Sequence, residues 1–233
     1  MIKKTFFGIS AVLLSAQVFS APITWTDWTS AENWTSAETG DSGWATGTMG
    51  GVTVNYTGDV NFAQLGTGRN YWTEGTPAPY TGSPEVDNAP TASEMVAMRR
   101  SDITNTIKFS STVRDPILAI VSQGRPNRTV TYDFTDATET FQVLSGGVGF
   151  FGQGTSSPAV GDSGDDLKGD EFHGVIQFQG DVDEISWTAA PDEGWHGFTV
   201  GTAATVPEPG SIALFVLGLT GLFGARARRR AQH

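Results

Sequence analysis

The chain has 233 residues, including 29 glycines and no cysteine, and its formal net charge is −11. The lack of cysteine excludes disulfide bonds, thiolate metal ligands and a cysteine nucleophile. Residues 21–206 carry 24 acidic and only 8 basic side chains, so they cannot form the basic face that a nucleic-acid partner requires.

Residues 1–20 have the three parts of a secretory signal peptide. Two lysines give a positive start, and residues 6–14 form an apolar stretch that is too short to span a membrane comfortably. A small-residue cleavage site follows, and we expect the cut before Ala21. The protein is therefore predicted to be exported, with these residues removed from the fold.

The next 180 residues predict an all-β ectodomain. Low charge with many glycine, threonine and aromatic residues is typical of strands joined by many turns. Short strand patterns with turn signals at regular spacing favour an antiparallel β-sandwich, jelly-roll-like in its connections. The predicted strands occupy residues 52–56, 60–65, 105–110, 116–122, 129–134, 140–145, 171–178, 184–188 and 195–200.

The sequence predicts more detail at three places. Thr57-Gly58-Asp59 is a good turn, which predicts a hairpin between the first two strands. Residues 116–122 form a continuous apolar run, as expected for a strand buried between two layers. Residues 92–100 are the one possible helix, and we interpret them as a strand or irregular segment.

The domain boundaries follow from composition. Residues 73–90 are rich in proline and glycine and predict a long surface loop rather than a boundary. No low-complexity linker interrupts the body. We therefore expect one ectodomain over residues 21–201, a short stalk over 202–206 and a separate C-terminal segment over 207–230.

Three early tryptophans, Trp25, Trp28 and Trp34, are the candidate carbohydrate-binding residues. An exposed indole plane offers a stacking surface to the apolar face of a sugar ring. The alternative is that these side chains pack in the core, because tryptophans are mostly buried.

A loop rich in aspartate is the candidate metal site. Asp162, Asp165, Asp166 and Asp170 offer hard oxygen ligands on a flexible segment, which suits calcium, although the spacing is not that of an EF-hand. The alternative is a solvated acidic loop, since blocks of like charge repel one another.

Glu171 and His173 are the candidate acid and base of a hydrolase, together with Asp181 or Asp183. Positions two apart on a strand face the same way. The alternative is a polar edge facing solvent. No Gly-x-Ser-x-Gly elbow and no pair of histidines with zinc spacing occurs, so we expect no enzymatic activity.

The C-terminal segment combines three features in order. Pro207-Glu208-Pro209 is followed by 14 apolar or small residues from 212 to 225, about 21 Å of helix. A basic cluster closes it: Arg226, Arg228, Arg229 and Arg230. Such a cluster stays cytoplasmic, so the body would lie outside the membrane. A permanent single-span anchor is the alternative to a processed one.

This arrangement over residues 207–230 resembles a PEP-CTERM sorting signal. The resemblance implies a Gram-negative bacterium that makes exopolysaccharide, and cutting near the Pro-Glu-Pro triplet by exosortase, a membrane enzyme. It implies a transient membrane anchor, followed by release to the envelope or the medium. The prolines suit this role because they deny the backbone helix and sheet hydrogen bonds around Glu208.

These observations predict an exported, non-enzymatic envelope or extracellular-matrix protein that binds or organises exopolysaccharide, with calcium as a candidate cofactor. A secreted hydrolase acting on polysaccharide or protein is the alternative.

Overall fold

The computed structural model describes residues 22–33, 42–91, 93–134, 140–152, 154, 158–161 and 164–203. Within these residues the chain forms fifteen strands and no helix, so the all-β prediction is confirmed. No described segment is a helix long and apolar enough to cross a membrane. The predicted signal peptide and the predicted sorting signal both lie outside the described residues.

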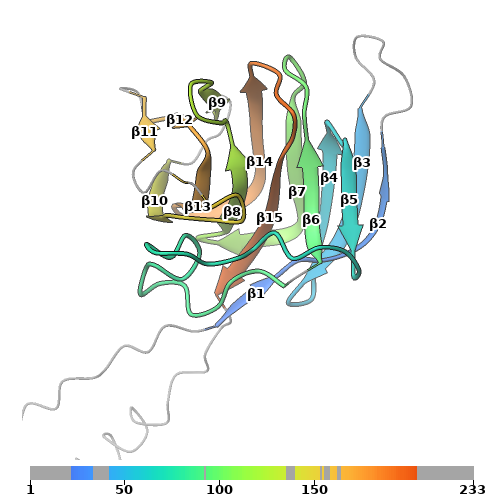
Figure 1. The fold of residues 1–233 in the computed structure, drawn as a ribbon. Helices are drawn as coiled ribbons and strands as arrows, with labels where there is room; N and C mark the ends of the chain where they lie inside the picture. The colour runs from blue at the N-terminus through green and yellow to red at the C-terminus, as the bar shows by residue number, and fades with distance from the viewer. Residues whose placement is uncertain are drawn as a thin grey trace, which may run out of the picture.

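The strands form two antiparallel sheets in a sandwich-like arrangement (Figure 1). The first, here the β8 sheet, has the order β10 (Phe141–Gly146), β13 (Phe172–Phe178), β8 (Ile117–Gln123), β15 (His196–Ala203), β6 (Glu94–Met98) and β5 (Phe62–Leu65), with β1 (Ile23–Trp25) also paired to β15. The second, the β14 sheet, has the order β11 (Ala159–Val160), β12 (Asp166–Gly169), β9 (Val130–Asp133), β14 (Asp181–Ala190), β7 (Asn105–Arg114), β4 (Val52–Gly58), β3 (Gly43–Met49) and β2 (Asp27–Glu32). The jelly-roll connectivity stays a prediction.

The main core lies between the two sheets. Phe198 of β15 packs against Trp187 of β14 and Tyr56 of β4, with ring centroids 5.3 and 5.0 Å apart. A second apolar cluster lies on the other face of the β8 sheet, where the segment between β5 and β6 supplies Trp72, Tyr80 and Val86. Because both faces of this sheet are covered, every residue of β8 is buried, which confirms the expectation for residues 116–122.

The segment between β5 and β6 contains the predicted long loop, residues 73–90. It has no strand, but it runs across the β8 sheet and is more than a surface loop (Figure 1). Tyr80 is fully buried there and its ring lies 5.2 Å from that of Trp72. The aromatic and apolar residues among its prolines and glycines explain the difference, because they cover apolar surface that would otherwise face water.

The predicted hairpin between residues 52–56 and 60–65 is wrong. These segments became β4 and β5, which belong to different sheets. The buried Asp59 carboxylate explains the crossing, because it accepts backbone N–H groups of Arg99 and Arg100 at the end of β6 and pairs with the Arg100 guanidinium at 3.3 Å. The actual partner of β4 is β3, joined to it through Gly50 and Gly51, whose φ values of 56° and 90° suit a two-residue hairpin turn.

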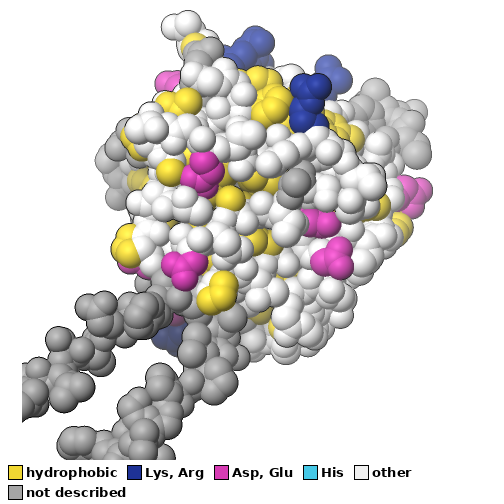
Figure 2. All heavy atoms as spheres, turned by 60° about the horizontal axis from the view of Figure 1, so that its bottom comes forward, with side chains coloured by type: hydrophobic (Ala, Val, Ile, Leu, Met, Phe, Trp, Pro, Cys, Tyr) yellow, Lys and Arg dark blue, Asp and Glu magenta, His cyan; other side chains and the backbone are white. Residues whose placement is uncertain are grey.

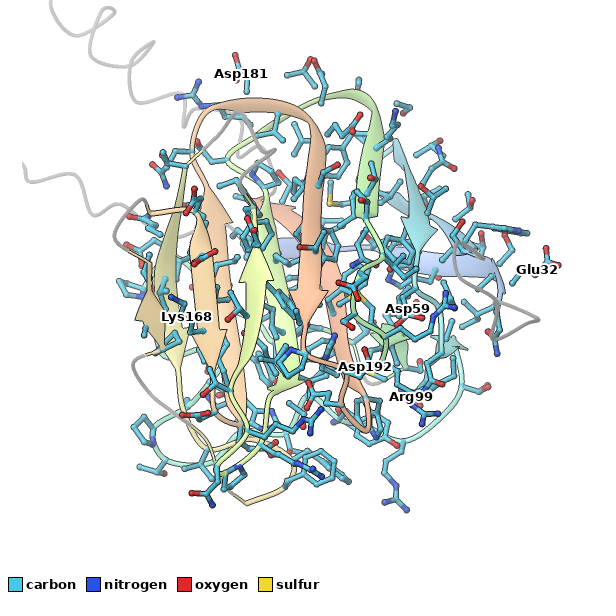
Figure 3. All side chains as sticks on the ribbon, turned by 90° about the horizontal axis from the view of Figure 1, so that it is seen from above. Glu32, Asp59, Arg99, Lys168, Asp181 and Asp192 are labelled. Carbon is cyan, nitrogen blue, oxygen red and sulfur yellow. The ribbon has the colours of Figure 1, made fainter. Side chains whose placement is uncertain are left out.

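Charged side chains differ in their surroundings. In Figure 3, Glu32, Lys168 and Asp181 lie at the periphery, whereas Asp59 lies further in, near Arg99.

Segment 92–100 contains β6, so the strand interpretation for it is confirmed. The strands that sequence patterns missed are short or rich in glycine, threonine and serine: β1, β2, β3, β11 and β12.

The two ends of the described body lie side by side. Ile23 of β1 pairs with Ala203 of β15, so β15 includes the first two residues of the predicted stalk. Both lie at the bottom of Figure 1. The eight residues of β15 span roughly 26 Å at about 3.3 Å per residue. The other end of β15 is therefore remote from the point where the C-terminal segment leaves.

Candidate functional site

A small pocket lies at that remote end of the β8 sheet, where β8 ends, β13 begins and the chain enters β15. Its volume is about 180 Å³. We call it the Glu171 pocket, and it is lined by Ser122, Gly124, Arg125, Phe151, Glu171, Glu193, Gly194 and Trp195. Two carboxylates, a hydroxyl and two aromatic rings therefore converge on one cavity.

A β-bulge shapes the floor of the pocket. Phe172 pairs with Gln123 and Gly174 with Ile120, so β8 has one residue more than β13 in between. Ser122 lies in this bulge with a φ of 59°, and Glu171 has a φ of 61°. Left-handed conformations are uncommon for residues with side chains, and both bulges and such conformations are found at functional sites.

The floor is held by a network of hydrogen bonds around the Glu171 carboxylate. Ser122 Oγ donates to Glu171 Oε1 at 2.7 Å, and His173 Nε2 lies 3.0 Å from the same oxygen. The backbone N–H of Ser122 donates to His173 Nδ1 at 3.3 Å. Because Nδ1 accepts this bond, the ring proton is on Nε2, and His173 is a neutral donor to the carboxylate.

Tyr80 supports this assignment from the segment that covers the sheet. Its hydroxyl lies 3.5 Å from His173 Nδ1. Burial raises the pKa of Tyr80 well above its usual range, and the charges of Glu74 and Glu171 raise it further. The phenol therefore keeps its proton and is a second potential donor to Nδ1.

A second carboxylate is held in a similar way. Glu193 Oε1 accepts the backbone N–H of Gly124 at 3.0 Å and contacts His196 Nδ1. Nε2 of His196 is buried without a hydrogen-bond partner among the described residues. Because an ionised carboxylate only accepts hydrogen bonds, Nδ1 of His196 is the donor in this contact.

Aromatic side chains form the rim. The Phe151 side chain is 45% exposed, and its ring centroid lies 5.9 Å from that of the half-buried Trp195. Tyr71 packs on Trp195 with centroids 4.9 Å apart and on Phe150 at 4.8 Å. The Arg69 guanidinium lies over the Phe150 ring at 5.6 Å. The pocket therefore opens beside a partly exposed aromatic surface.

The carbohydrate prediction for Trp25 and Trp28 is wrong. Trp28 is 1% exposed and its indole donates to Thr199 Oγ1 at 3.1 Å, while Trp25 is 7% exposed and donates to the carbonyl of Asn88. Neither ring has a face available for stacking on a sugar, because Trp28 packs in the main core and Trp25 in the second apolar cluster. Trp34 lies outside the described residues.

The calcium prediction gains no support from the described residues. Asp166 pairs with Lys168 at 3.4 Å, and Asp170 accepts a hydrogen bond from Thr129 Oγ1 at 2.6 Å. Asp165 is also described, whereas Asp162 is not. No three acidic or histidine side chains in the described part of the chain are placed to hold a metal ion. Calcium binding therefore stays a prediction.

The hydrolase candidates are brought together only in part. Glu171 and His173 meet, and both are buried, so the alternative of a solvent-facing polar edge is wrong. Asp183 lies on β14 of the other sheet, where it accepts from Thr112 Oγ1 at 2.5 Å. Asp181 pairs with Arg114 at 3.2 Å.

Sequence patterns missed the remaining pocket residues. In the sequence, Trp195 lies in a late predicted strand and is typical of a core residue. Ser122 and Glu193 belong to no motif. Glu193 is 22 positions from Glu171, and no spacing rule connects them. The one signal for a site here was that the polar residues Glu171 and His173 alternate along a predicted strand.

A larger groove of about 660 Å³ lies at the opposite end, near the start of β1 and the end of β15. Its lining includes Thr24, Thr202, and the Arg114 and Asp115 side chains, which pair with each other at 3.2 Å. Figure 2 shows the molecule from this lower side, where acidic side chains are scattered and basic ones lie towards one edge. The groove has no convergent set of titratable groups like that of the Glu171 pocket.

The comparisons with known proteins concern the C-terminal segment. Residues 205–230 match the family model of the PEP-CTERM protein-sorting motif. The comparisons with curated proteins and with solved structures gave no match to the chain. The motif is the recognition signal for exosortase and implies export and processing at the cell envelope. The chain therefore carries a PEP-CTERM protein-sorting motif at residues 205–230, which supports an exported protein that is sorted by exosortase.

Proposed function

We propose that the protein is an envelope or extracellular-matrix protein that binds exopolysaccharide at the Glu171 pocket without cleaving it. The observation that carries the proposal is the combination of Trp195 and Phe151 at the rim with Glu171 and Glu193 in the floor. Aromatic rings contact the apolar faces of sugars, and carboxylates accept hydrogen bonds from their hydroxyl groups. These residues take the place of the buried Trp25 and Trp28.

The size and the position of the pocket support this proposal. A volume of about 180 Å³ is well below the roughly 300 Å³ at which pockets for drug-sized ligands begin. It suits one sugar unit of a polymer that continues over the aromatic surface. The pocket lies at the start of β15, opposite the end at Ala203 from which the chain continues to the sorting motif.

Hydrolysis is the second candidate, because two carboxylates lining one cavity are the usual groups of glycoside hydrolases. The hydrogen bonds in the floor disfavour only a hydrolase with a serine nucleophile. Ser122 donates its hydroxyl to Glu171 and its backbone N–H to His173 Nδ1, so His173 has no free lone pair with which to activate that hydroxyl.

The experiment is a sedimentation assay of the full-length, detergent-solubilised chain with exopolysaccharide from the producing bacterium. We expect retention of the wild type and loss of retention in Trp195→Ala and Phe151→Ala. Trp44→Ala is the matched control, since Trp44 is 39% exposed on β3 of the other sheet. Equal retention of Trp195→Ala and Trp44→Ala would contradict the proposal.

Two further arms of the assay separate the alternatives. Repeating it with calcium and with EDTA tests the calcium prediction, which expects retention only with calcium. Measuring reducing ends released from the polymer tests hydrolysis. Release that disappears in Glu171→Gln and Glu193→Gln would replace the binding proposal by the hydrolase.

A further inference from the structure

We propose that the Glu171 pocket binds the ammonium group of an amino sugar, so that its ligand is a glycan with free amino groups. The inference rests on the proposed function and narrows it to one class of ligand. It follows from the charge balance of the pocket, from its aromatic rim and from the ligand sets found among the described residues, none of which suits a metal ion.

Among the described residues, the two nearly buried carboxylates of the pocket have no lysine or arginine partner. The side chains of Glu171 and Glu193 are 9% and 3% exposed, and no Lys or Arg among the described residues pairs with either. Each carboxylate contacts one histidine: Glu171 contacts His173, whose Nδ1 accepts the Ser122 N–H, and Glu193 contacts Nδ1 of His196. Within the described part of the chain, no hydrogen bond engages the second oxygen, Oε2, of either carboxylate.

The buried carboxylate of Asp59, unlike those of the pocket, has a basic partner. Asp59 pairs with the Arg100 guanidinium and accepts two backbone N–H groups. Buried charges in proteins are usually compensated in this manner, since an isolated one is costly. Two uncompensated carboxylates at one cavity therefore favour a ligand that brings a positive charge.

The remaining lining residues indicate an organic cation. No group of three potential metal ligands occurs among the described residues, which disfavours a metal ion here. The Phe151 and Trp195 rings, tilted by 59° to each other, form an aromatic corner at the mouth of the pocket. An ammonium group is attracted both by such ring faces and by carboxylates, whereas a hydroxyl group gains much less from the rings.

Arg125 is the one basic side chain that lines the pocket. It is exposed and forms no ion pair with either glutamate. Its charge is screened by water, whereas the carboxylates lie in a less polar environment, where their field on a ligand is stronger. The floor of the pocket therefore stays attractive to a cation.

The test compares three oligosaccharides with the same β-1,4-linked glucose backbone and a different group at carbon 2. They carry an ammonium group (glucosamine pentamer), an acetamido group (N-acetylglucosamine pentamer) or a hydroxyl group (glucose pentamer). Binding to the full-length, detergent-solubilised chain is measured by calorimetry at 0.15 M salt. We expect at least tenfold tighter binding of the glucosamine pentamer than of the other two.

Variants separate a built site from general attraction to an acidic protein. Glu193→Gln, Glu171→Gln and Trp195→Ala should each reduce the preference about tenfold. Glu184→Gln removes the same charge from an exposed side chain on β14 and should leave the preference intact. Melting temperatures of all variants check that they are folded. Glu171→Gln and Glu193→Gln change different side chains, so each tests the inference separately.

The other outcomes distinguish failure of the ammonium inference from failure of the proposed function. Equal binding of the three pentamers would overturn the ammonium inference and leave glycan binding in place. A preference that is the same in Glu193→Gln and in Glu184→Gln would be adventitious attraction and would also overturn it. If no pentamer binds but the protein is retained by native exopolysaccharide, only the ammonium inference is overturned. If both assays fail, the proposed function is overturned as well.

Discussion

Ser122 and Glu171 meet at the end of β8 with a hydrogen bond of 2.7 Å, and each has a left-handed backbone conformation. One residue belongs to a bulge and the other precedes the partner strand. Their contact places a carboxylate in the floor of a pocket rather than on a flat sheet edge.

Replacing Ser122 separates the hydroxyl from the backbone strain. Ser122→Ala removes a hydrogen bond to a carboxylate and should cost about 1–3 kcal/mol of unfolding free energy. Ser122→Gly loses the same bond but relieves the left-handed conformation, which costs a side-chain residue about 1–2 kcal/mol. We therefore expect the glycine variant to be the more stable of the two in urea denaturation. The reverse order would contradict the role given to the backbone.

Trp28 and Trp195 should have opposite roles. Trp28→Ala removes a buried ring from the main core and should cost about 3–5 kcal/mol of stability. Trp195→Ala should cost less than that and instead reduce polysaccharide retention. Urea denaturation and sedimentation of both variants check this. Loss of retention in a folded Trp28→Ala protein, with Trp195→Ala unaffected, would restore the early tryptophan site.

Glu94 should make stability depend on pH. Burial raises the pKa of this carboxyl above its ordinary value of 4.5, although its Oε2 accepts the Trp28 N–H at 2.7 Å. The folded state then holds the proton more tightly than the unfolded state, so stability falls as pH rises from 4.5 through the raised pKa. Glu94→Gln has no such titration.

The measurement for Glu94 is urea denaturation of the wild type and of Glu94→Gln between pH 4 and pH 7. We expect the wild type to lose stability relative to the variant as the pH rises. Parallel curves would show that Glu94 has the same pKa in both states.

Asn105 should be one of the most costly polar residues to remove. It is fully buried, and its Oδ1 accepts hydrogen bonds from the Tyr56 hydroxyl at 2.6 Å and the Asp59 N–H at 3.0 Å. Asn105→Ala leaves both donors without this acceptor and should cost about 3 kcal/mol. The exposed Asn55 is the control, and Asn55→Ala should stay close to wild type in thermal denaturation.

The sorting signal should determine processing. Replacing Pro207, Glu208 and Pro209 by alanine removes the triplet at the start of the sorting motif. Mass spectrometry of cell fractions should then find the C-terminal segment still attached and the protein retained in the membrane. Glu184→Gln is a control that leaves the motif intact. Normal removal of the segment in the triple variant would place the cleavage signal elsewhere.

Several features of this protein follow from its sequence alone, because their signals are local. The apolar run at 116–122 requires two covering layers wherever it lies, and the strand within 129–134 can be predicted from its own alternation of apolar and polar residues. The Pro-Glu-Pro triplet, the apolar stretch and the arginines form one continuous segment, so the sorting motif can be identified without a fold.

The tertiary structure decided the features that depend on distant partners. Residues 52–56 pair with β3 and β7 instead of with residues 60–65, because Asp59 directs the chain to the other sheet. The same holds for Trp28, which is buried by β15 from the far end of the chain. Glu171 and Glu193 share a pocket only because β13 and β15 both flank β8, and no local pattern contains that pairing.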